Sequence, residues 1–399
     1  MSAEKTLSNF LLLPELKILK TERKGLSSNI YYCEKIKTQE YCPNCASGKY
    51  WTHEWREITV KDEPVRGKEI ILKIRKRRLK CKSCKKIFHE PIQGIMPKKR
   101  FTQRFKRGVL WACENYRDLK RVKKAFRCSH QFIYDALYET LELNRRRKLN
   151  YPWPKTIGID EHAFGRSVKG RKTRFCTMIV DFNNKRPMEL VEGRSGPLLW
   201  KDLAHIPGRE NVTHVALDLS DPYKKFVKDF FPNAELVADK FHVLRLLNHH
   251  IMRRRKEITG TRATLKAKNL LLMSNKKLDW RERKTLWEYL DKHPELKEVY
   301  AFKESLHKLY RIKGYNRASK ALTKLTDRMA QSTLKEIKRL RGTLIKWRNE
   351  ILNYFKTGIT NARTEGFNHI AKLLKRNAFG FKSFKNYRLR VLNAVLPDT

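Results

Sequence analysis

The clearest alternation of apolar and polar positions in the chain lies between residues 155 and 240, and it predicts a set of short strands. The first, Lys155-Thr-Ile-Gly-Ile-Asp-Glu-His-Ala-Phe164, alternates as a half-buried strand does and carries the acidic pair Asp160 and Glu161. Further strands are expected at 174–181, 187–192, 212–218 and 234–239, with helices at 197–204 and 222–231. Short connections make the first three strands an antiparallel meander, so this region is predicted to be α/β.

Three meander strands followed by helix, strand, helix and strand form an order that resembles the ribonuclease-H-like fold, with a mixed five-stranded sheet. In that fold the first and fourth strands are neighbours, which would place Asp160 beside Asp218. Two adjacent carboxylates raise each other's pKa unless a cation lies between them, and carboxylate oxygens suit Mg²⁺. Taken alone, Asp160 has a second interpretation, a salt-bridged core residue. Strand alternation turns Glu161 to the opposite face, which predicts a structural role for it.

Residues 101–143 have a helical pattern throughout, and residues 122–137 within them have the sequence pattern of a helix-turn-helix motif. Ala125 is small where the two helices would cross, Ser129 is placed to cap the second helix, and Ile133 and Leu137 would face the core. Arg127 stands in the turn where glycine is usual. A DNA-reading motif would direct three side chains to the major groove, namely His130, Gln131 and Tyr134. The alternative is an ordinary helical hairpin.

Residues 243–358 are basic, helical and rich in spaced leucines, and the block is too long to be a loop, so we expect an inserted helical subdomain. Its core would contain three tryptophans, Trp280, Trp287 and Trp347. The run Arg253–Lys256 and the lysine clusters near 275 and 337 would face DNA.

A last helix is predicted within residues 360–376. Its apolar face carries Phe367, Ile370, Ala371 and Leu374, and its polar face carries Glu365, Asn368, His369 and Lys372. One acid among bases is the pattern expected if Glu365 meets a metal ion while its neighbours, Lys372 among them, meet phosphate. The alternative is a solvated helix with an incidental glutamate.

The net charge of the chain indicates what kind of molecule it binds. The chain of 399 residues has 90 Lys and Arg against 41 Asp and Glu, a formal net charge of +49. Such an excess repels itself unless a polyanion neutralises it, so nucleic acid is the expected partner. A membrane surface is the competing interpretation, but no apolar run approaches the ~18 residues of a spanning helix. The N-terminal segment, Met1–Pro14, has too short an apolar patch for a signal peptide.

Cysteine spacing predicts a zinc site. Two Cys-x-x-Cys pairs, Cys42 with Cys45 and Cys81 with Cys84, are separated by 35 residues that a hairpin could fill. Two unrelated reduced pairs are the alternative, and three residues could each replace one ligand: Cys33, His53 and His89. The basic run from Lys73 to Lys86 would contact phosphate.

These features occur in an order that resembles insertion-sequence transposases of the ISL-three type, which have a DDE catalytic domain. The resemblance spans roughly residues 30 to 395 and rests on the zinc knuckles, the helix-turn-helix and four short motifs: Ile159-Asp-Glu161, Leu217-Asp-Leu-Ser220, Asp239-Lys-Phe-His-Val243 and Thr364-Glu-Gly-Phe-Asn368. Arg127 is its main departure. The expected domains are a zinc module (1–95), a helix-turn-helix domain (96–150), a catalytic core in two parts (151–242 and 359–399) and the helical insertion (243–358).

The resemblance implies a DNA transposase that cleaves and joins strands at the terminal inverted repeats of its own element. Asp160, Asp218 and Glu365 would hold two Mg²⁺ (or Mn²⁺) ions, while Asp239 and His242 would be auxiliary; Asp239 is the alternative second aspartate. Structural Zn²⁺, terminal-repeat and target DNA, a homo-oligomer and a bacterial, cytoplasmic, nucleoid-associated location are implied as well. Two competing functions are a transposase-derived DNA-binding regulator that no longer cuts and a structure-specific nuclease.

Overall fold

The computed structural model describes residues 13–96, 98–116, 118–148, 151–166, 173–260 and 265–394. The chain divides into two compact units, Met1–Leu143 and Asn144–Thr399. Most of the N-terminal segment for which a signal peptide was considered lies outside the described residues. Within the described ranges, no helix has both the length and the apolar character needed to cross a membrane.

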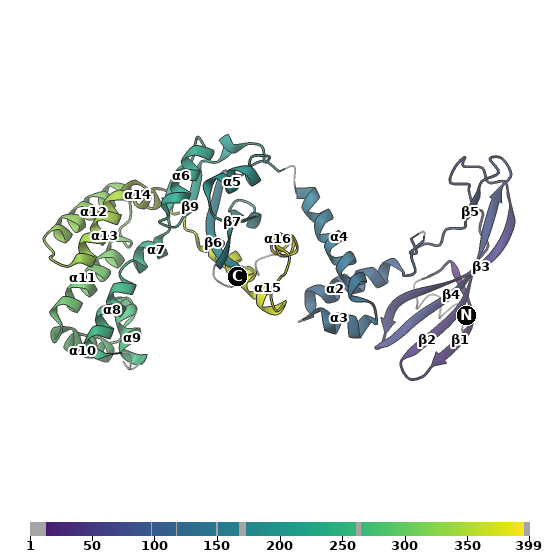
Figure 1. Ribbon diagram of the computed structural model, residues 1–399, viewed down its shortest axis with the longest axis horizontal. Coiled ribbons are helices and arrows are strands. Elements are labelled where there is room, and N and C mark those ends of the chain that lie inside the picture. The colour runs from purple at the N-terminus through teal and green to yellow at the C-terminus, as the bar shows by residue number, and fades with distance from the viewer. Residues whose placement is uncertain are drawn as a thin grey trace. The chain divides into compact units, whose positions relative to one another are not determined.

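The first unit is built on a twisted sheet (Figure 1). Its strands are β1 (Leu16–Lys24), β2 (Ser28–Lys35), β3 (Tyr50–Val65), β4 (Lys68–Cys81) and β5 (Ile87–His89). The order is β1-β2-β4-β3, with β5 on β4; β2 and β4 are parallel and the other pairs antiparallel. The long β3–β4 hairpin is the predicted connection between the two cysteine pairs. One core lies under the sheet (Val60, Ile70, Leu72 and Ile74 among others), and a second, smaller core surrounds the cysteines.

Three helices complete this unit: α2 (Gln103–Asn115), α3 (Leu119–Phe126) and α4 (His130–Lys148). Ser129 Oγ accepts a hydrogen bond from the Phe132 amide (3.1 Å), and Ile133 and Leu137 are buried, as predicted. Arg127 has φ 47° and ψ 43°, the left-handed conformation that glycine adopts with least strain. The expectation for Ala125 is wrong: it is exposed, because Val122 and Phe126 form the buried face of α3.

The second unit contains a mixed sheet of five strands in the order β10-β9-β6-β7-β8. They are β6 (Thr156–Arg166), β7 (Thr173–Asp181), β8 (Arg186–Glu192), β9 (His214–Leu217) and β10 (Glu235–Ala238). β6, β7 and β8 form the antiparallel meander, and β9 and β10 run parallel to β6. The predicted strands and their neighbours are therefore confirmed, with ends that differ by one or two residues.

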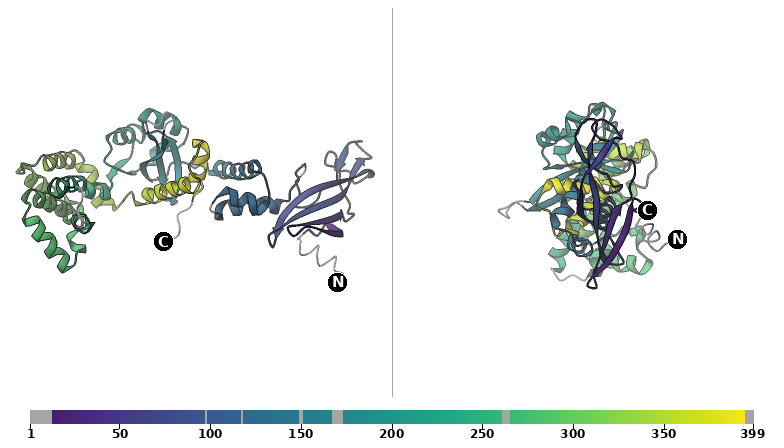
Figure 2. Two further views of the ribbon diagram at one scale, coloured as in Figure 1. Left: turned by 60° about the horizontal axis from the view of Figure 1, so that its bottom comes forward. Right: turned by 90° about the vertical axis from the view of Figure 1, so that its right-hand side faces the viewer.

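Helices cover both faces of this sheet (Figures 1 and 2). Ile157 and Ile159 of β6 face a core shared with α5 (Gly196–Leu203) and α6 (Asp221–Phe230). On the other face, alternate residues such as Met178 and Val180 pack against α15 (Ala362–Asn377) and α16 (Phe384–Leu392). Strand periodicity thus divides the sheet into two cores, and Asp160 belongs to the face that α15 covers.

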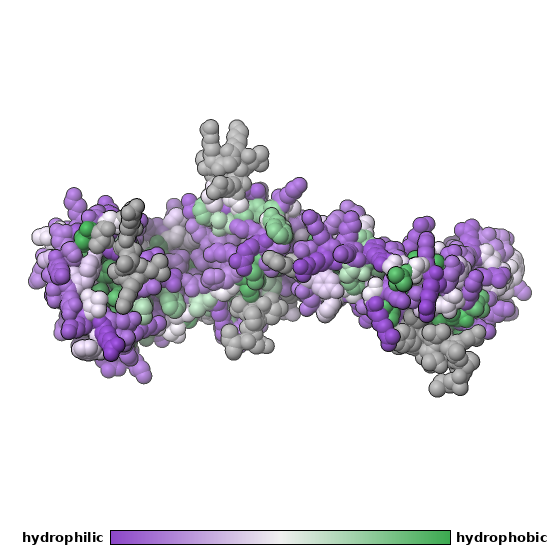
Figure 3. Space-filling model, turned by 90° about the horizontal axis from the view of Figure 1, so that it is seen from below, coloured by the Kyte–Doolittle hydropathy of each residue, from purple (hydrophilic) through white to green (hydrophobic). Residues whose placement is uncertain are grey.

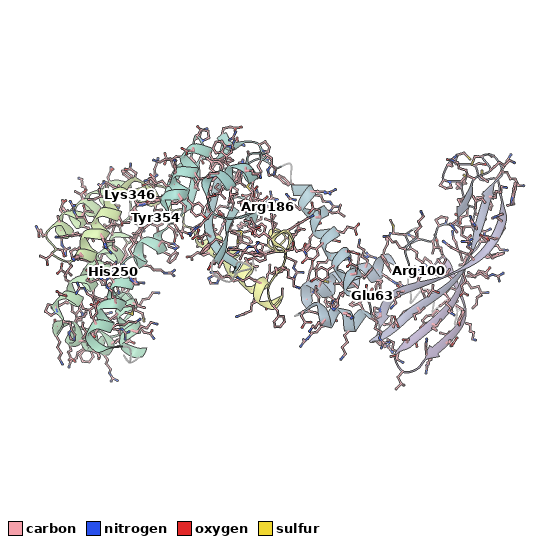
Figure 4. The ribbon with its side chains drawn as sticks, viewed as in Figure 1. Glu63, Arg100, Arg186, His250, Lys346 and Tyr354 are labelled. Atoms are coloured by element: carbon pink, nitrogen blue, oxygen red, sulfur yellow. The ribbon has the colours of Figure 1, made fainter. Side chains whose placement is uncertain are left out.

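Between β10 and α15 the chain forms a helical block. It contains α7 (Lys240–Arg245), α8 (Asn248–Thr259), α9 (Leu265–Leu272), α10 (Trp280–Asp291), α11 (Pro294–Leu309), α12 (Tyr315–Ala330), α13 (Lys335–Lys346) and α14 (Arg348–Thr357), with a short 3-10 turn at Asn275–Lys277 (η2). A second 3-10 turn, Arg209–Asn211 (η1), lies outside this block, before β9. Lys346 and Tyr354, labelled in Figure 4, lie where this block adjoins the sheet. Lys346 Nζ is 2.5 Å from Asp221 Oδ2 of α6, and Lys240 Nζ donates to Tyr354 Oη (3.3 Å).

Two expectations for the helical block need correction. Trp347 is buried, but Trp280 and Trp287 are 72% and 37% exposed, because α10 lies at the surface and buries Leu286 and Leu290 instead. The basic run beginning at Arg253 does not face solvent as a whole either. Arg254 pairs with Glu295 and the buried Glu336, and Arg255 is buried. In the view of Figure 3 the surface is mainly hydrophilic, with apolar residues in separate patches.

Candidate active site and zinc centre

Three aspartates meet where three neighbouring parallel strands reach the same edge of the sheet. Asp218 follows β9 and Asp239 follows β10, while Asp160 lies within β6. The register pairs Ile159 with Leu217, and Leu217 with Ala238, so the residues that follow are level with one another. The predicted placement of Asp160 beside Asp218 is confirmed by this register, and Asp239 extends the row by one strand.

His242, on α7, lies between two of these carboxylates. Its Nδ1 is 2.9 Å from Asp239 Oδ2, with which it forms a hydrogen bond, and 2.8 Å from Asp218 Oδ1. Asp218 Oδ1 is buried, and the His242 imidazole is the polar group that lies next to it. Asp218, Asp239 and His242 each offer a ligand atom within 4.8 Å of the others.

Burial and charge set the protonation of this cluster. Burial, and then the charge of Asp218, raise the pKa of Asp160 to about 7. Burial also opposes ionisation of Asp239, but hydrogen bonds from His242 and from the Asn361 amide hold the pKa of that carboxyl below its usual value. The contact of the His242 imidazole with Asp218, and next its hydrogen bond with Asp239, raise the pKa of His242 to about 10. Asp239 and His242 thus favour their charged forms, whereas Asp160 resists ionisation.

Helix α15 reaches this row through Asn368. Asn368 is 3% exposed, and its Nδ2 donates to Asp160 Oδ2 (2.7 Å). Glu365, one helical turn earlier, is half-buried, and its carboxylate forms no hydrogen bond or salt bridge among the described residues. The apolar face predicted for this helix is confirmed, but Asn368 is not free to meet phosphate as expected, because its amide is buried between two side chains.

A buried chain of hydrogen bonds extends from Asn368 to α16. Asn368 Oδ1 is 2.7 Å from His162 Nδ1, and His162 Nε2 is 2.7 Å from Tyr387 Oη. Burial lowers the pKa of His162 to about 4, so the ring is neutral. Because the Asn368 amide nitrogen donates to Asp160, its oxygen accepts from His162 Nδ1–H, and Nε2 must then accept from the Tyr387 hydroxyl. The Cys176 thiol lies 3.1 Å from the same Nε2.

The close approach of α15 to β6 depends on a glycine. A Cβ on Gly158 would lie 2.1 Å from Thr364 Oγ1 and 2.5 Å from Phe182 Cζ. Asn361, just before α15, donates from Nδ2 to the Ile159 carbonyl (3.2 Å) and from its backbone to Asp239 Oδ1 (3.1 Å). The start of α15 is therefore attached to both β6 and the residue after β10.

Glu161 lies on the other face of β6, as strand alternation predicts. It forms a salt bridge with Arg194 (3.2 Å), and Tyr223 Oη donates to its Oε2 (3.3 Å). These contacts give Glu161 a structural environment away from Asp160.

The four predicted zinc ligands come together in the first unit. Cys42, Cys45, Cys81 and Cys84 hold their sulfurs within 4.8 Å of one another. Cys42 and Cys84 Sγ are 3.5 Å apart, and Cys45 and Cys81 Sγ are 3.6 Å apart. Four thiolates at about 2.3 Å from one zinc ion in a tetrahedron are roughly 3.8 Å apart, so the spacing fits zinc. Among the described residues, Cys33, His53 and His89 are not part of this group.

The four residues predicted to touch DNA are accessible. His130 and Gln131 are exposed in the first turn of α4, where Gln131 Nε2 donates to Asp135 (2.7 Å). Tyr134 is 43% exposed and stacks on Tyr138, and Lys372 is exposed on α15.

Sequence reasoning missed His162 and Tyr387. His162 is two residues after Asp160, so strand periodicity places both on one face of β6, and that signal was available. Tyr387 gave no such signal, because its hydroxyl meets a ring 225 positions away along the chain.

Comparison with known proteins agrees with this arrangement. The family model of the ISL3 DDE type, described as "Transposase", matches residues 157–391, more than half of the chain. The model described as the zinc-finger of transposase IS204/IS1001/IS1096/IS1165 matches residues 38–84, which contain all four clustered cysteines.

Two curated relatives are transposases. The transposase for insertion sequence element IS1001 of Bordetella parapertussis is 24% identical over 391 residues, covering 94% of this chain and 93% of that protein. The transposase for insertion sequence element IS1557 of Mycobacterium tuberculosis is 25% identical over 262 residues, 57% of each chain. With the family match spanning the sheet, the helical block and α15, the chain belongs to the ISL3 family of DDE transposases, enzymes that cleave and rejoin DNA.

Proposed function

We propose that Asp160, Asp218 and Glu365 form the catalytic triad of this transposase, with Asp239 and His242 as auxiliary residues. The observation that carries the proposal is the shared level of Asp160 and Asp218 on two adjacent parallel strands. Glu365 lies on α15, the helix whose Asn368 donates to Asp160, one turn away from that contact. Asp239 is the weaker candidate for second aspartate, because both of its oxygens already accept hydrogen bonds from His242 or Asn361.

The donor set fits a divalent cation. Asp160 resists ionisation because it is buried beside the charge of Asp218, so a cation bound between the two carboxylates would favour the charged form of both. Oxygen-only ligands from the triad favour Mg²⁺ or Mn²⁺ over softer metals. When bound, such ions supply a lowered pKa for the attacking water or 3′ hydroxyl and stabilise the leaving oxygen.

The chain's own residues hold the triad in place. Asn368 fixes one oxygen of Asp160 while the Glu161 amide donates to the other (2.7 Å), so the carboxylate has one orientation. The hydrogen bond between His242 and Asp239 keeps the imidazole beside Asp218. Fixed carboxylates reduce the reorganisation needed when the reacting phosphate arrives.

We further propose that the first unit recognises the terminal inverted repeats. The zinc module and α3–α4 would contact DNA, with His130, Gln131 and Tyr134 toward the major groove and Lys372 of the second unit on phosphate. The net charge of +49 supports extensive phosphate contact. Arg127 adopts the backbone conformation of the usual glycine, so its presence does not prevent a helix-turn-helix turn.

The strand order β10-β9-β6-β7-β8 supports assignment of the catalytic core to the ribonuclease-H-like type. The corresponding boundaries are 1–95 for the zinc module, 96–150 for the helix-turn-helix domain, 151–242 and 359–399 for the core, and 243–358 for the insertion. Pairing of two element ends during transposition requires at least two active sites, so we propose a homodimer or a larger assembly.

The test is cleavage of labelled DNA bearing the inverted repeats that flank the gene. The purified full chain should nick such ends with Mg²⁺ or Mn²⁺ and leave scrambled ends intact. Repeat binding without cleavage under any divalent metal would instead identify a DNA-binding regulator, and cleavage of branched DNA regardless of sequence would identify a structure-specific nuclease.

A further inference from the structure

An open groove of about 540 Å³ lies in the helical block, and one of its lining residues, Phe241, directly precedes His242 in the chain. Its volume is within the roughly 300–1,000 Å³ of pockets that hold small organic ligands. Helices α7 and α8, the segment after α9, and the end of α11 form its walls, and the lining residues are Phe241, Leu244, Arg245, Asn248, Leu272, Met273, Ser274, Lys276, Lys277, His307 and Arg311.

Phe241, which lines the groove, is one residue away along the chain from His242, which contacts Asp218 and Asp239. Asp239 caps α7 by accepting from the His242 amide, and Phe241 lies between these two residues in the chain. Phe241, Leu244 and Arg245 have the i, i+3, i+4 spacing of one helix face, while His242 is turned from Phe241 by about 100°. Helix α7 therefore presents His242 to Asp218 and its neighbouring face to the groove.

Apolar groups form the floor of the groove and cations its rim. Phe241 is 38% exposed and Met273 is 37% exposed. The rim carries the exposed side chains of Arg245, Lys276, Lys277 and Arg311, and none of the eleven described lining residues is acidic. Arg311 Nη2 donates to Ser274 Oγ (2.9 Å) and so joins two of the walls.

This combination matches the chemistry of a nucleotide. An aromatic ring and aliphatic side chains accept the face of a base, and the surrounding cations accept its phosphates. A base within a duplex exposes only its edges, so the face of a base can reach the floor only after it leaves the stack. A second copy of this chain is a poor occupant, because it would bring further positive charge to four cations.

We propose that the groove binds one unpaired nucleotide of the DNA strand whose scissile phosphate lies at Asp160 and Asp218. The Arg245 guanidinium lies over the Phe241 ring, 6.0 Å from its centroid, so the exposed remainder of the ring stacks on the extruded base. Lys276, Lys277 and Arg311 neutralise the flanking phosphates. Extrusion pulls the strand out of the duplex next to the carboxylates. The inference rests on the proposed function, since it requires that cleavage occur at this row of acids.

The test uses repeat-end DNA with 2-aminopurine at each position flanking the cleaved bond, together with the full-length protein. Wild type should raise the fluorescence of the probe at one position, where the base leaves the stack. Phe241→Ala should abolish that rise and weaken cleavage of paired ends by roughly 5- to 150-fold, the range of base–aromatic stacking. Trp280→Ala, which removes a more exposed aromatic outside the groove, should leave both unchanged.

A second substrate separates the groove from a folding defect. A mismatch at the responding position already unpairs the base, so it should restore most of the cleavage that Phe241→Ala loses, whereas a misfolded variant would not be rescued. Wild-type cleavage with no responsive position overturns the inference and leaves the proposed function standing. A changed oligomeric state in Phe241→Ala with an unchanged fluorescence signal assigns the floor to a copy of the chain and also overturns it. A wild-type protein that cleaves no repeat end overturns the proposed function itself.

Discussion

Removal of one zinc ligand should unfold one end of the first unit and leave the other end intact. Cys45 is the best position for the test because it is exposed, whereas Cys42 and Cys81 are buried. Cys45→Ala therefore deletes a thiolate with little loss of packing. Cys128→Ala is the matched control, since Cys128 is half-buried in the turn before α4 and lies outside the cluster.

The size of the effect follows from how little apolar packing surrounds the cysteines. Besides the sulfurs, the core of this end contains only Leu79 and Phe88, with Tyr50 partly buried against them. Burial of two such side chains contributes roughly 3–6 kcal/mol, whereas a structural zinc ion contributes about 10–16 kcal/mol. The folded state of the two Cys-x-x-Cys loops therefore depends on the bound zinc ion. The far end of the sheet has its own core around Val60, Leu72 and Ile74, which needs no zinc.

The assay combines metal content with limited proteolysis. Wild type and Cys128→Ala should contain one zinc ion per chain, and Cys45→Ala much less. A chelator, or Cys45→Ala, should expose cleavage sites in residues 38–49 and 82–89 while β1 and β2 stay protected. The reasoning is refuted if Cys45→Ala loses its zinc and yet resists proteolysis in these segments as wild type does.

Three further substitutions test the second unit by thermal unfolding and by cleavage of repeat ends. Gly158→Ala should destabilise by roughly 1–3 kcal/mol and impair cleavage, because its Cβ would collide with Thr364, whereas Gly165→Ala in the same strand has open space and should be neutral; equal effects would contradict the packing. Asn368→Leu should lower the free energy of unfolding by roughly 2–5 kcal/mol because it leaves Asp160 Oδ2 and His162 Nδ1 without a partner, against about 1 kcal/mol for Tyr387→Phe; the reverse order would contradict the central place of Asn368 in these hydrogen bonds. Arg254→Met leaves the buried Glu336 without its ion-pair partner and should lower the free energy of unfolding by about 3–5 kcal/mol. The neighbouring Arg253→Met should change it by less than about 1 kcal/mol, because Arg253 forms an exposed pair with Glu257. No change in stability for Arg254→Met would show that Glu336 does not need its partner.

Strand alternation was sufficient to locate the sheet and its acids. Each predicted strand buries one or both faces, so an error of register would have exposed apolar residues, and Asp160 and Asp218 follow directly from the strand order. The four cysteines were equally accessible to sequence reasoning, since zinc geometry constrains their spacing.

Helix faces were harder to interpret, because periodicity shows that a face exists but not what covers it. Asn368 sits on a polar face, and a buried amide there has the same sequence pattern as a solvated one. Arg254 looked like part of a basic run, yet its partners come from α11 and α13. Trp280 looked like core by its size alone and is 72% exposed. In each case the deciding neighbour lies far away in the sequence.

The row of acids at the edge of the second sheet is proposed to be the site at which the protein cuts DNA. The most direct measurement is Mg²⁺-dependent nicking of labelled inverted-repeat ends by wild type, Asp160→Asn, Glu365→Gln and Glu161→Gln, with DNA binding measured in parallel. We expect Asp160→Asn and Glu365→Gln to bind the ends and not cut them, and Glu161→Gln, altered on the opposite face of the same strand, to cut them. Wild-type nicking by Asp160→Asn would show that Asp160 is not a catalytic residue.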